Sequence, residues 1–386
     1  MTIKTSFIIS LSALAFFACG SESGEGNFSN NPKAEETEES SSSVAESSAQ
    51  QEESRKAIDY SKGKAMNAKI GRGINMGNTF DATCETCWGA GPIEEYQVKA
   101  IKEAGFNSIR LPVRWDREAS STPPYTISDT YLARVKEVVG WINAQGLIAI
   151  INMHHHQSFL TDTTAGARPI AENTEKHLTR VDSIWRQVAD YFAKVSSDSL
   201  VFELFNEPRW AVTAEIHNQM IARTYPIIRK NNPDRTLMYG SYMYNAYSGI
   251  RTLKLPEDGN IIFTPHYYVP STFALQGEGG RCSENPKTWE GTSSEIKSMT
   301  EDFDKMVSLA DEYYPGGLPI NIGEFGATYC GGISSRVKWV KQVVKLAKER
   351  GFSWNYWGFT NIGGYEIYDK KTQTWSDTET LNALLN

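Results

Sequence analysis

The chain has 386 residues and a formal net charge of −7, which is spread unevenly along the sequence. Residues 20–60 contain ten Asp and Glu against three Lys and Arg, so residues 61–386 carry a net charge of only −1 once Lys4 is counted. The folded part is therefore almost neutral. Because it shows no basic patch, it is not expected to bind nucleic acid.

The first 19 residues have the features of a secretory signal peptide: Lys4, an apolar run over 7–18, and then Cys19. The apolar run is shorter than the roughly 18 residues that a membrane-spanning helix needs. The ending FFAC resembles a bacterial lipobox, which predicts export, lipidation of Cys19, and a cell-surface or outer-membrane location with the lipid as the only membrane contact. Phe16 departs from the usual leucine, so plain cleavage and secretion is the alternative.

Residues 20–60 form a low-complexity segment that includes EETEESSSSVAESSAQQEES. Such a segment has too little apolar surface to offset the entropy that folding would cost, so we expect a disordered acidic tether. A single folded domain is then expected over residues 61–386.

From Ile70 onward, short apolar strands alternate with amphipathic helical segments such as 94–105, 129–146 and 334–351. The predicted strands are residues 70–76, 107–113, 147–154, 200–206, 236–240, 260–266, 319–325 and 352–358. Eight strand–helix units in about 320 residues match the count and size of a (β/α)8 barrel of the α/β class. A doubly wound sheet is the alternative, but GRGINMGN lacks the spacing of its glycine-rich phosphate loop.

A barrel of this kind carries its chemistry on the loops that follow its strands. Every predicted strand but the fifth ends in a polar or stacking side chain, namely Asn75, Asn78, Arg110, His154–His156, Asn206, Glu207, His266, Tyr268, Glu324 and Trp357. Two carboxyls at one mouth suit glycoside hydrolysis, in which one protonates the leaving oxygen and the other attacks the sugar. Arg110 is expected to keep Glu324 ionised, whereas desolvation and the nearby negative charge are expected to keep Glu207 protonated.

Glu203 interrupts the apolar run of the fourth predicted strand. Burying an ionised carboxylate costs several kcal/mol unless it is paired. We therefore expect Glu203 to lie deeper than Glu207 and to be paired with a cation.

Five motifs, in order along the chain, resemble glycoside hydrolase family 5, the cellulase family of retaining barrel enzymes. They are GINMGNTFD (73–81), GFNSIRLPVRW (105–115), FELFNEP (202–208), HYYVP (266–270) and NIGEFG (321–326). The resemblance implies that Glu207 is the acid/base and Glu324 the nucleophile, with no cofactor and no metal. It further implies supporting or sugar-binding roles for Arg110, His154, Asn206, His266, Tyr268 and Trp357.

Asn75 and Trp88 are further candidates for substrate contact. Asn75 ends the first predicted strand, and Trp88 follows in the next loop. Sugar rings stack on aromatic side chains, although core packing is the alternative for any single aromatic residue.

The successive histidines 154–156 raise a metal hypothesis. Adjacent strand residues point to opposite faces, so only His154 and His156 are expected to share a side. No Asp or Glu adjoins the triplet in the sequence, and His154 is the candidate functional residue. A metal-dependent barrel hydrolase is the alternative.

Four further cysteines, Cys84, Cys87, Cys282 and Cys330, permit two disulfides in an exported chain, with the pairing left open. The CETC motif could indicate zinc or redox chemistry, but no second Cys-x-x-Cys accompanies it. A loop disulfide or free thiols are therefore expected.

Within the family, GINMGNTFDA and NMHHH resemble the branch that acts on cellulose, mixed-linkage β-glucan and xyloglucan. We predict a monomeric endo-β-1,4-glucanase with a β-glucan polysaccharide as its substrate. A xyloglucanase, a mannanase or a mixed-linkage glucanase are alternatives within the family. A catalytically inactive surface glycan-binding protein is the alternative from another class.

Overall fold

The computed structural model describes residues 57–156, 159, 171–278, 281–360 and 363–386. The predicted signal peptide, Cys19 and most of the predicted tether lie outside the described residues. Ile58 already donates a backbone hydrogen bond to Pro315, and Tyr60 is fully buried. Ile58 and Tyr60, which precede the predicted boundary at 61, therefore pack on the domain.

Nine parallel strands form one curled sheet in the order β6-β5-β4-β3-β2-β1-β9-β8-β7. They are β1 (Arg72–Asn75), β2 (Ser108–Leu111), β3 (Ile148–Asn152), β4 (Leu200–Glu203), β5 (Leu237–Tyr239), β6 (Ile261–Phe263), β7 (His266–Tyr267), β8 (Asn321–Phe325) and β9 (Ser353–Tyr356). The sheet closes where Phe263 pairs with Ile320. β6 and β7 are the two halves of the sixth predicted strand, separated at Pro265, which has no N–H to donate. The predicted (β/α)8 barrel is confirmed.

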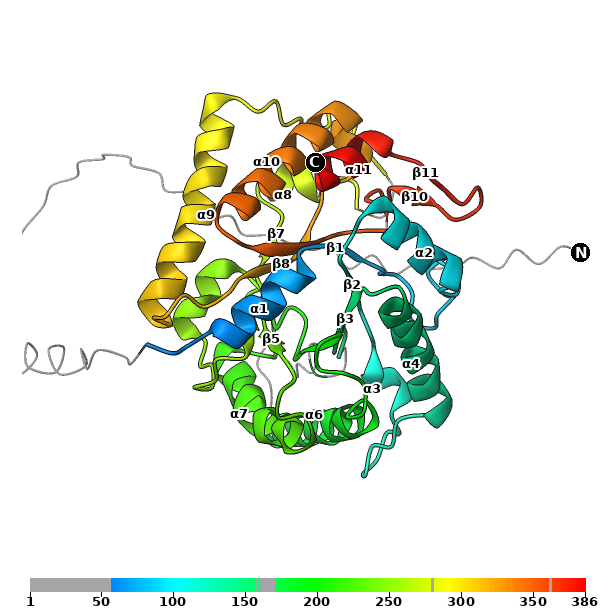
Figure 1. Cartoon of the computed structure of the whole chain (residues 1–386), viewed down its shortest axis with the longest axis vertical. Coiled ribbons are helices and arrows are strands. Elements are labelled where there is room, and N and C mark those ends of the chain that lie inside the picture. Colours follow the sequence, from blue (N-terminus) through cyan, green and yellow to red (C-terminus); the bar gives the residue numbers. More distant parts are fainter. Residues whose placement is uncertain (1–56, 157–158, 160–170, 279–280, 361–362) are drawn as a thin grey trace, which may run out of the picture. The chain divides into compact units, whose positions relative to one another are not determined.

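Helices surround the strands (Figure 1). They are α1 (Ser61–Ile70), α2 (Glu95–Ala104), α3 (Trp115–Glu118), α4 (Asp129–Ala144), α6 (Ala171–Tyr191), α7 (Ala214–Asn231), α8 (Ser271–Ala274), α9 (Ser293–Tyr313), α10 (Ile333–Glu349) and α11 (Thr378–Leu385). Two 3₁₀ turns lie at Tyr247–Thr252 and Tyr329–Gly331, and β10 (Tyr368–Asp369) and β11 (Thr374–Trp375) form a small hairpin. The helices predicted over 94–105, 129–146 and 334–351 correspond to α2, α4 and α10. None of the helices in the described residues is both long and apolar enough to cross a membrane.

Helix α1 closes one end of the barrel interior. Its Met66 and Ile70 form a buried cluster with strand residues Ile148, Ile150, Val201, Met238 and Ile262. Gly63 of α1 lies so close to the Ile261 carbonyl oxygen that a Cβ there would come within 2.4 Å of it. Because α1 covers the end at which the strands begin, the opposite end, where the strands finish, is the one available for chemistry.

The four paired cysteines form two disulfides, Cys84–Cys87 and Cys282–Cys330. The first closes a tight turn in the loop after β1. The second ties the segment after α8 to the turn after β8, across a sequence separation of 48 residues. The structure thus settles the pairing that the sequence left open.

Removing the long-range disulfide is expected to destabilise the domain far more than removing the short one. A cross-link lowers the entropy of the unfolded chain by an amount that grows with the loop it closes, so the Cys282→Ser/Cys330→Ser variant should lose about 2–4 kcal/mol of unfolding free energy. The Cys84→Ser/Cys87→Ser variant is the matched control, since its cysteines are only 3 residues apart. Urea unfolding at pH 7 measures both, and equal losses would contradict this explanation.

His217 makes the stability of the domain sensitive to acid. It lies in α7, is 1% exposed, and its Nε2 has no hydrogen-bond partner in the described part of the chain. Burial lowers the pKa of His217 to about 3. Below its unfolded pKa of about 6.5, the unfolded state binds a proton that the folded state does not, so the stability contribution is complete at neutral pH and is lost as the pH falls toward 3.

The expected size of this effect is about 3 kcal/mol between pH 7 and pH 4. The His217→Leu variant should therefore lose about 3 kcal/mol less unfolding free energy than the wild type over that interval. Urea unfolding of both proteins at the two pH values measures the difference, because other titrating groups contribute equally to each. The same acid loss in both proteins would show that His217 is not the cause.

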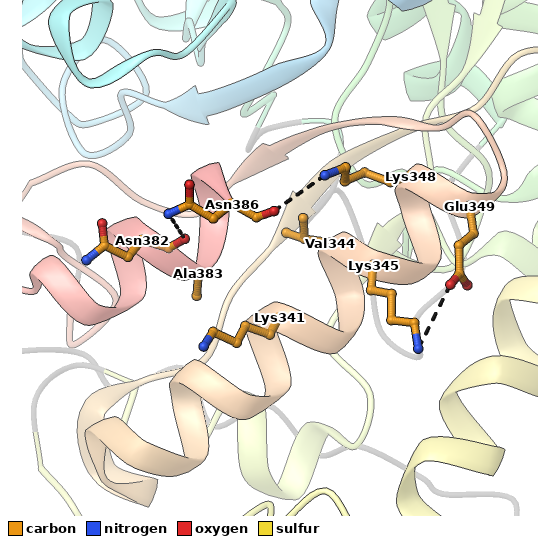
Figure 2. A pocket seen from close by; sticks show the side chains of 8 residues that line it. All are labelled: Lys341, Val344, Lys345, Lys348, Glu349, Asn382, Ala383 and Asn386. Atoms are coloured by element: carbon orange, nitrogen blue, oxygen red, sulfur yellow. Dashed lines mark hydrogen bonds and ion pairs between the residues drawn. The ribbon is translucent and has the colours of Figure 1, made fainter.

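A surface pocket of about 490 Å³ lies between α10 and α11 (Figure 2). It is lined by Lys341, Val344, Lys345, Lys348, Glu349, Asn382, Ala383 and Asn386. These residues include none of the predicted site residues, which gather at the ends of the strands.

Candidate active site

Strand register places the two predicted catalytic segments at the same mouth. His266 of β7 is paired directly with Glu324 of β8. Glu207 follows β4 in a loop that crosses toward them, and its Oε1 lies 2.9 Å from His266 Nδ1. One ligand atom each of Glu207, His266 and Glu324 lies within 4.8 Å of the others. The two carboxyls are therefore neighbours, as their strand positions predicted.

Arg110 is fully buried and joins the network beneath this pair. Its Nε and Nη2 donate to the two carboxylate oxygens of Glu203 at 2.6 and 2.7 Å. Nη1 donates to Asn75 at 2.9 Å and to Glu324 Oε1 at 2.7 Å, and Nη2 also donates to Asn206 Oδ1 at 2.7 Å. All five N–H groups of the guanidinium are thus used. Arg110 is therefore the cation that was predicted to pair with Glu203.

Glu324 accepts hydrogen bonds on both of its oxygens. Arg110 donates to Oε1, and the Tyr268 hydroxyl donates to Oε2 at 3.1 Å. Burial raises the pKa of Tyr268 well above its usual value, so this hydroxyl remains protonated and available to donate. The arrangement holds the Glu324 carboxylate in one orientation, with both oxygens facing hydrogen-bond donors.

Burial is the largest influence on the pKa of Glu324 and raises it. The charges of His266 and Arg110 lower it, but the negative charge of Glu207 acts with burial, and the pKa of Glu324 lies above its usual value. Arg110 cannot fully offset the burial, because it shares its single positive charge between Glu203 and Glu324.

Burial also raises the pKa of Glu207, but the hydrogen bond from His266 and the charge of Arg209 outweigh it, so this pKa lies below its usual value. The order expected from the sequence, with Glu324 the more acidic group, is therefore wrong for this structure. That expectation counted Arg110 but did not count the hydrogen bond and charge of His266, or the smaller contribution of Arg209, at Glu207. Carboxyls this close titrate as a pair that shares one proton.

Glu207 has a backbone φ of 47°, in the left-handed region that non-glycine residues seldom adopt. Such strain is concentrated at functional sites, where the surrounding structure holds it. His266 holds the Glu207 side chain and is in turn placed by Asn245, whose Nδ2 lies 3.1 Å from His266 Nε2. Asn245 follows β5, so the fifth strand does contribute a polar side chain to the mouth, contrary to the prediction that it alone would not.

An aromatic group lies on the side of the mouth formed by β9, β1 and β3. The ring of Trp357 stacks on His154 at 5.8 Å with an interplanar angle of 4°. Gly77 supports this ring, because a Cβ there would come within 2.4 Å of it. Trp88, which is 40% exposed, lies 6.0 Å from His155. The predicted sugar-contacting aromatics are thus brought to one side.

The orientation expected for the histidine triplet is wrong. His155, rather than His156, shares the side of His154, and their rings are 4.6 Å apart. His156 is buried against Phe159 and Phe205 instead. The reason is that β3 ends at Asn152, so strand alternation no longer applies to the triplet.

Asp81, from the loop after β1, has ligand atoms within 4.8 Å of those of His154 and His155. Burial raises the pKa of Asp81 to about 6. This group and the Glu207–His266–Glu324 group are the two sets of three candidate metal ligands in the described part of the chain. The sequence missed the first set because Asp81 lies more than 70 positions from the histidines.

Asn152 was also missed. Its Nδ2 lies 3.3 Å from Glu203 Oε1 and 3.2 Å from His154 Nδ1, and its Oδ1 accepts from the Val113 N–H. An asparagine at the end of the otherwise apolar run IAIIN was the available signal.

Comparison with known proteins places this geometry in context. The family model described as cellulase (glycosyl hydrolase family 5) matches residues 72–363. Endoglucanase H of Acetivibrio thermocellus is 36% identical over 86% of this chain, which spans only 34% of that relative's length.

Two solved structures agree over most of the chain. A hyperthermophilic endo-β-1,4-glucanase in complex with substrate is 36% identical, with a TM-score of 0.76 over 84% of this chain and 100% of its own. Cel5A of Thermotoga maritima in complex with mannotriose is 31% identical, with a TM-score of 0.74 over 83% of this chain and 99% of its own.

Proposed function

Because the chain belongs to glycosyl hydrolase family 5, the cellulase family, and is a glycoside hydrolase, we propose that it is a retaining endo-β-1,4-glucanase. The observation that carries the proposal is the separation of Glu207 and Glu324, whose facing oxygens lie within 4.8 Å. Retaining glycosidases hold their carboxyls about 5–5.5 Å apart, whereas inverting enzymes need about 6.5–9.5 Å to admit a water.

In the proposed first step, Glu324 attacks the anomeric carbon and Glu207 protonates the departing glycosidic oxygen. Arg110 and Tyr268 orient Glu324 and accommodate its charge. The proposal requires the proton shared by the pair to lie on Glu207 when the leaving oxygen arrives, although without substrate the pKa of Glu207 lies below its usual value and that of Glu324 above it. In the second step, Glu207 takes a proton from water, and that water releases the sugar from Glu324.

The proposed sugar contacts follow from the same geometry. Trp357 is the floor beneath the sugar at the cleavage point, and His154, stacked against it, supports that sugar. Asn206 is oriented by Arg110 toward the proposed 2-hydroxyl position. Trp88 completes this side as an exposed stacking surface. Asn75, which was predicted to contact substrate, is instead fully buried: its amide donates to backbone carbonyls and its oxygen accepts from Arg110, so its role is to position that arginine.

The proposed substrate is the β-1,4-linked glucan of cellulose or mixed-linkage β-glucan. Endo-glucanase relatives support this choice. Xyloglucan and mannan remain candidate substrates, and the related Cel5A structure with mannotriose favours testing mannan directly.

The test is reducing-sugar release by the purified protein from carboxymethylcellulose, barley β-glucan, xyloglucan and mannan, each with and without a chelator. The proposal predicts chelator-insensitive hydrolysis of the first two. Loss of activity with chelator would favour the metal-dependent alternative through one of the two candidate ligand groups. Binding without hydrolysis of any of the four would favour the glycan-binding alternative.

We also propose that the protein is exported and anchored by a lipid on Cys19. Metabolic labelling with a radioactive fatty acid tests this, with Cys19→Ser as the control. Equal labelling of both proteins would contradict the anchor, and labelling of neither would favour plain secretion.

A further inference from the structure

A second exposed apolar surface lies across the mouth from Trp357. It consists of Trp210, Met243 and Tyr244, and is called here the Trp210 surface. Trp210 is 45% exposed and Met243 is 54% exposed. These residues follow β4 and β5, which stand opposite β9 and β1 in the closed order of strands. A glucan chain crossing the mouth over Glu324 and Glu207 would therefore have its leaving part on the Trp210 surface.

The backbone of this region is held in an unusual conformation. Five of the eight non-glycine residues with positive φ in the described chain lie here, namely Glu207, Trp210, Met243, Tyr244 and Asn245. Hydrogen bonds fix the two loops to each other and to themselves, from Tyr244 N to Pro208 O at 3.4 Å and from Asn245 N to Ser241 O at 3.0 Å. Because each such residue is costly unless its surroundings hold it, the Trp210 surface is a preformed feature.

Arg209 joins the Trp210 surface to Glu207. Its guanidinium carbon lies 4.8 Å from the Trp210 ring centroid and 5.0 Å from that of Tyr244. Nη1 donates to the Glu207 backbone oxygen at 2.8 Å and lies 3.4 Å from Glu207 Oε2. Among the described residues, Glu207 is the one carboxylate within ion-pair distance of Arg209.

One donor of this buried guanidinium is unused. Arg209 is 9% exposed, and its Nε has no hydrogen-bond partner among the described residues. A buried N–H without a partner is costly, so it favours a ligand that can accept from it. A sugar stacked beside Trp210 would bring several hydroxyl oxygens that can do so.

We infer that Arg209 is a positioning residue that couples binding of the leaving-group sugar on the Trp210 surface to proton donation by Glu207. The inference rests on the proposed function and extends it. Stacking holds the planar guanidinium in place, the Nε–H donates to a hydroxyl oxygen of the sugar, and Nη1 donates to the backbone oxygen and the carboxylate of Glu207. Bound sugar and acid are thereby kept in one arrangement by a single side chain.

The charge of Arg209 also acts on the proton that Glu207 must deliver. The other charged or titratable groups that influence Glu207, or are influenced by it, are His155, Tyr244, His266, Tyr268, Glu278, Glu324 and Tyr365. Of the cationic groups, Arg209 is the one that stays charged at every working pH. Removing its charge should therefore raise the pKa of Glu207 and move the basic limb of the activity profile to higher pH.

The test compares Arg209→Gln and Arg209→Lys with the wild type on two substrates. Cellotetraose has a sugar leaving group that needs both the Trp210 surface and the acid, whereas dinitrophenyl β-cellobioside needs neither. Arg209→Gln should lower kcat/KM for cellotetraose about 10- to 100-fold. It should change kcat/KM for the aryl substrate by less than about 3-fold. It should also move the basic limb of the pH–activity profile about 1 pH unit higher. Arg209→Lys should leave the basic limb at the wild-type pH, because lysine keeps the positive charge. Its kcat/KM for cellotetraose should still fall, because lysine lacks the planar guanidinium with its several N–H donors.

Equal losses on both substrates with an unmoved basic limb would reduce Arg209 to a structural residue and overturn the inference. Full recovery of cellotetraose cleavage in Arg209→Lys would overturn the sugar contact. A wild-type enzyme that cleaves the aryl substrate but not cellotetraose would contradict the Trp210 surface as a leaving-group site. Wild-type inactivity on both would overturn the proposed function itself, and the inference with it.

Discussion

Glu324→Gln is expected to lower kcat for β-glucan hydrolysis by at least about 10⁴-fold. Glutamine has nearly the same shape as glutamate, and its single carbonyl oxygen can still accept from Arg110, but its neutral amide cannot form the covalent bond to the anomeric carbon. The loss should appear equally on polysaccharide and on activated aryl cellobiosides, since both must form the glycosyl–enzyme bond. Initial rates on both substrates measure it.

The control for this variant is retained folding and ligand binding. Arg110 keeps its bidentate pairing with Glu203 in Glu324→Gln, so the network beneath the site should remain assembled. Its melting temperature and its binding of cellotetraose should stay close to those of the wild type. A variant that still turns over aryl cellobioside at a tenth of the wild-type rate would rule out Glu324 as the nucleophile.

Glu207→Ala is expected to separate substrates by their leaving groups. Glucose-type leaving groups need a proton from Glu207, and losing a general acid costs about 10²- to 10⁴-fold. Dinitrophenolate leaves without a proton, so formation of the glycosyl–enzyme should stay nearly normal with an activated aryl cellobioside. Turnover should then be limited by the second step, in which the general base is missing.

Added azide provides an independent check, because a small anion can replace water as the nucleophile without needing a base. Azide should accelerate turnover of the aryl substrate by Glu207→Ala and yield a β-glycosyl azide. Glu207→Gln serves as the matched control, since it removes the proton while keeping the bonding position near His266. Equal losses on both substrate types, without azide rescue, would count against the acid/base role.

Much of the barrel could be predicted because buried parallel strands appear in a sequence as short apolar runs. All eight predicted runs are strands of the sheet. The break at Pro265 was not anticipated, although a proline in a central strand removes a ladder hydrogen bond. The Cys282–Cys330 pairing could not be read from spacing, since it depends on how two loops at the mouth approach each other.

The site was predictable where strand ends alone determine position, as for Glu207, His266 and Glu324. It was not predictable where distant loops meet. Nothing local to Glu203 indicates that Arg110, 93 residues earlier, is its partner. Asn245 was missed because it follows a strand of three residues and sits in a left-handed turn.

The pKa order failed for the same reason. The sequence located one cation, Arg110, but gave no indication that Glu203 would occupy two of its donors. It also did not show how strongly His266, and then Arg209, whose guanidinium folds back beside Glu207, would lower the pKa of that carboxyl.

We propose that Glu324 forms a covalent glycosyl–enzyme intermediate in a retaining reaction. The direct measurement is mass spectrometry of the wild-type enzyme after reaction with dinitrophenyl 2-deoxy-2-fluoro-β-cellobioside, followed by peptide mapping. We expect one fluorocellobiosyl group per chain, attached to Glu324, and no label on Glu324→Gln. A label on any other residue, or an active enzyme that takes up none, would contradict it.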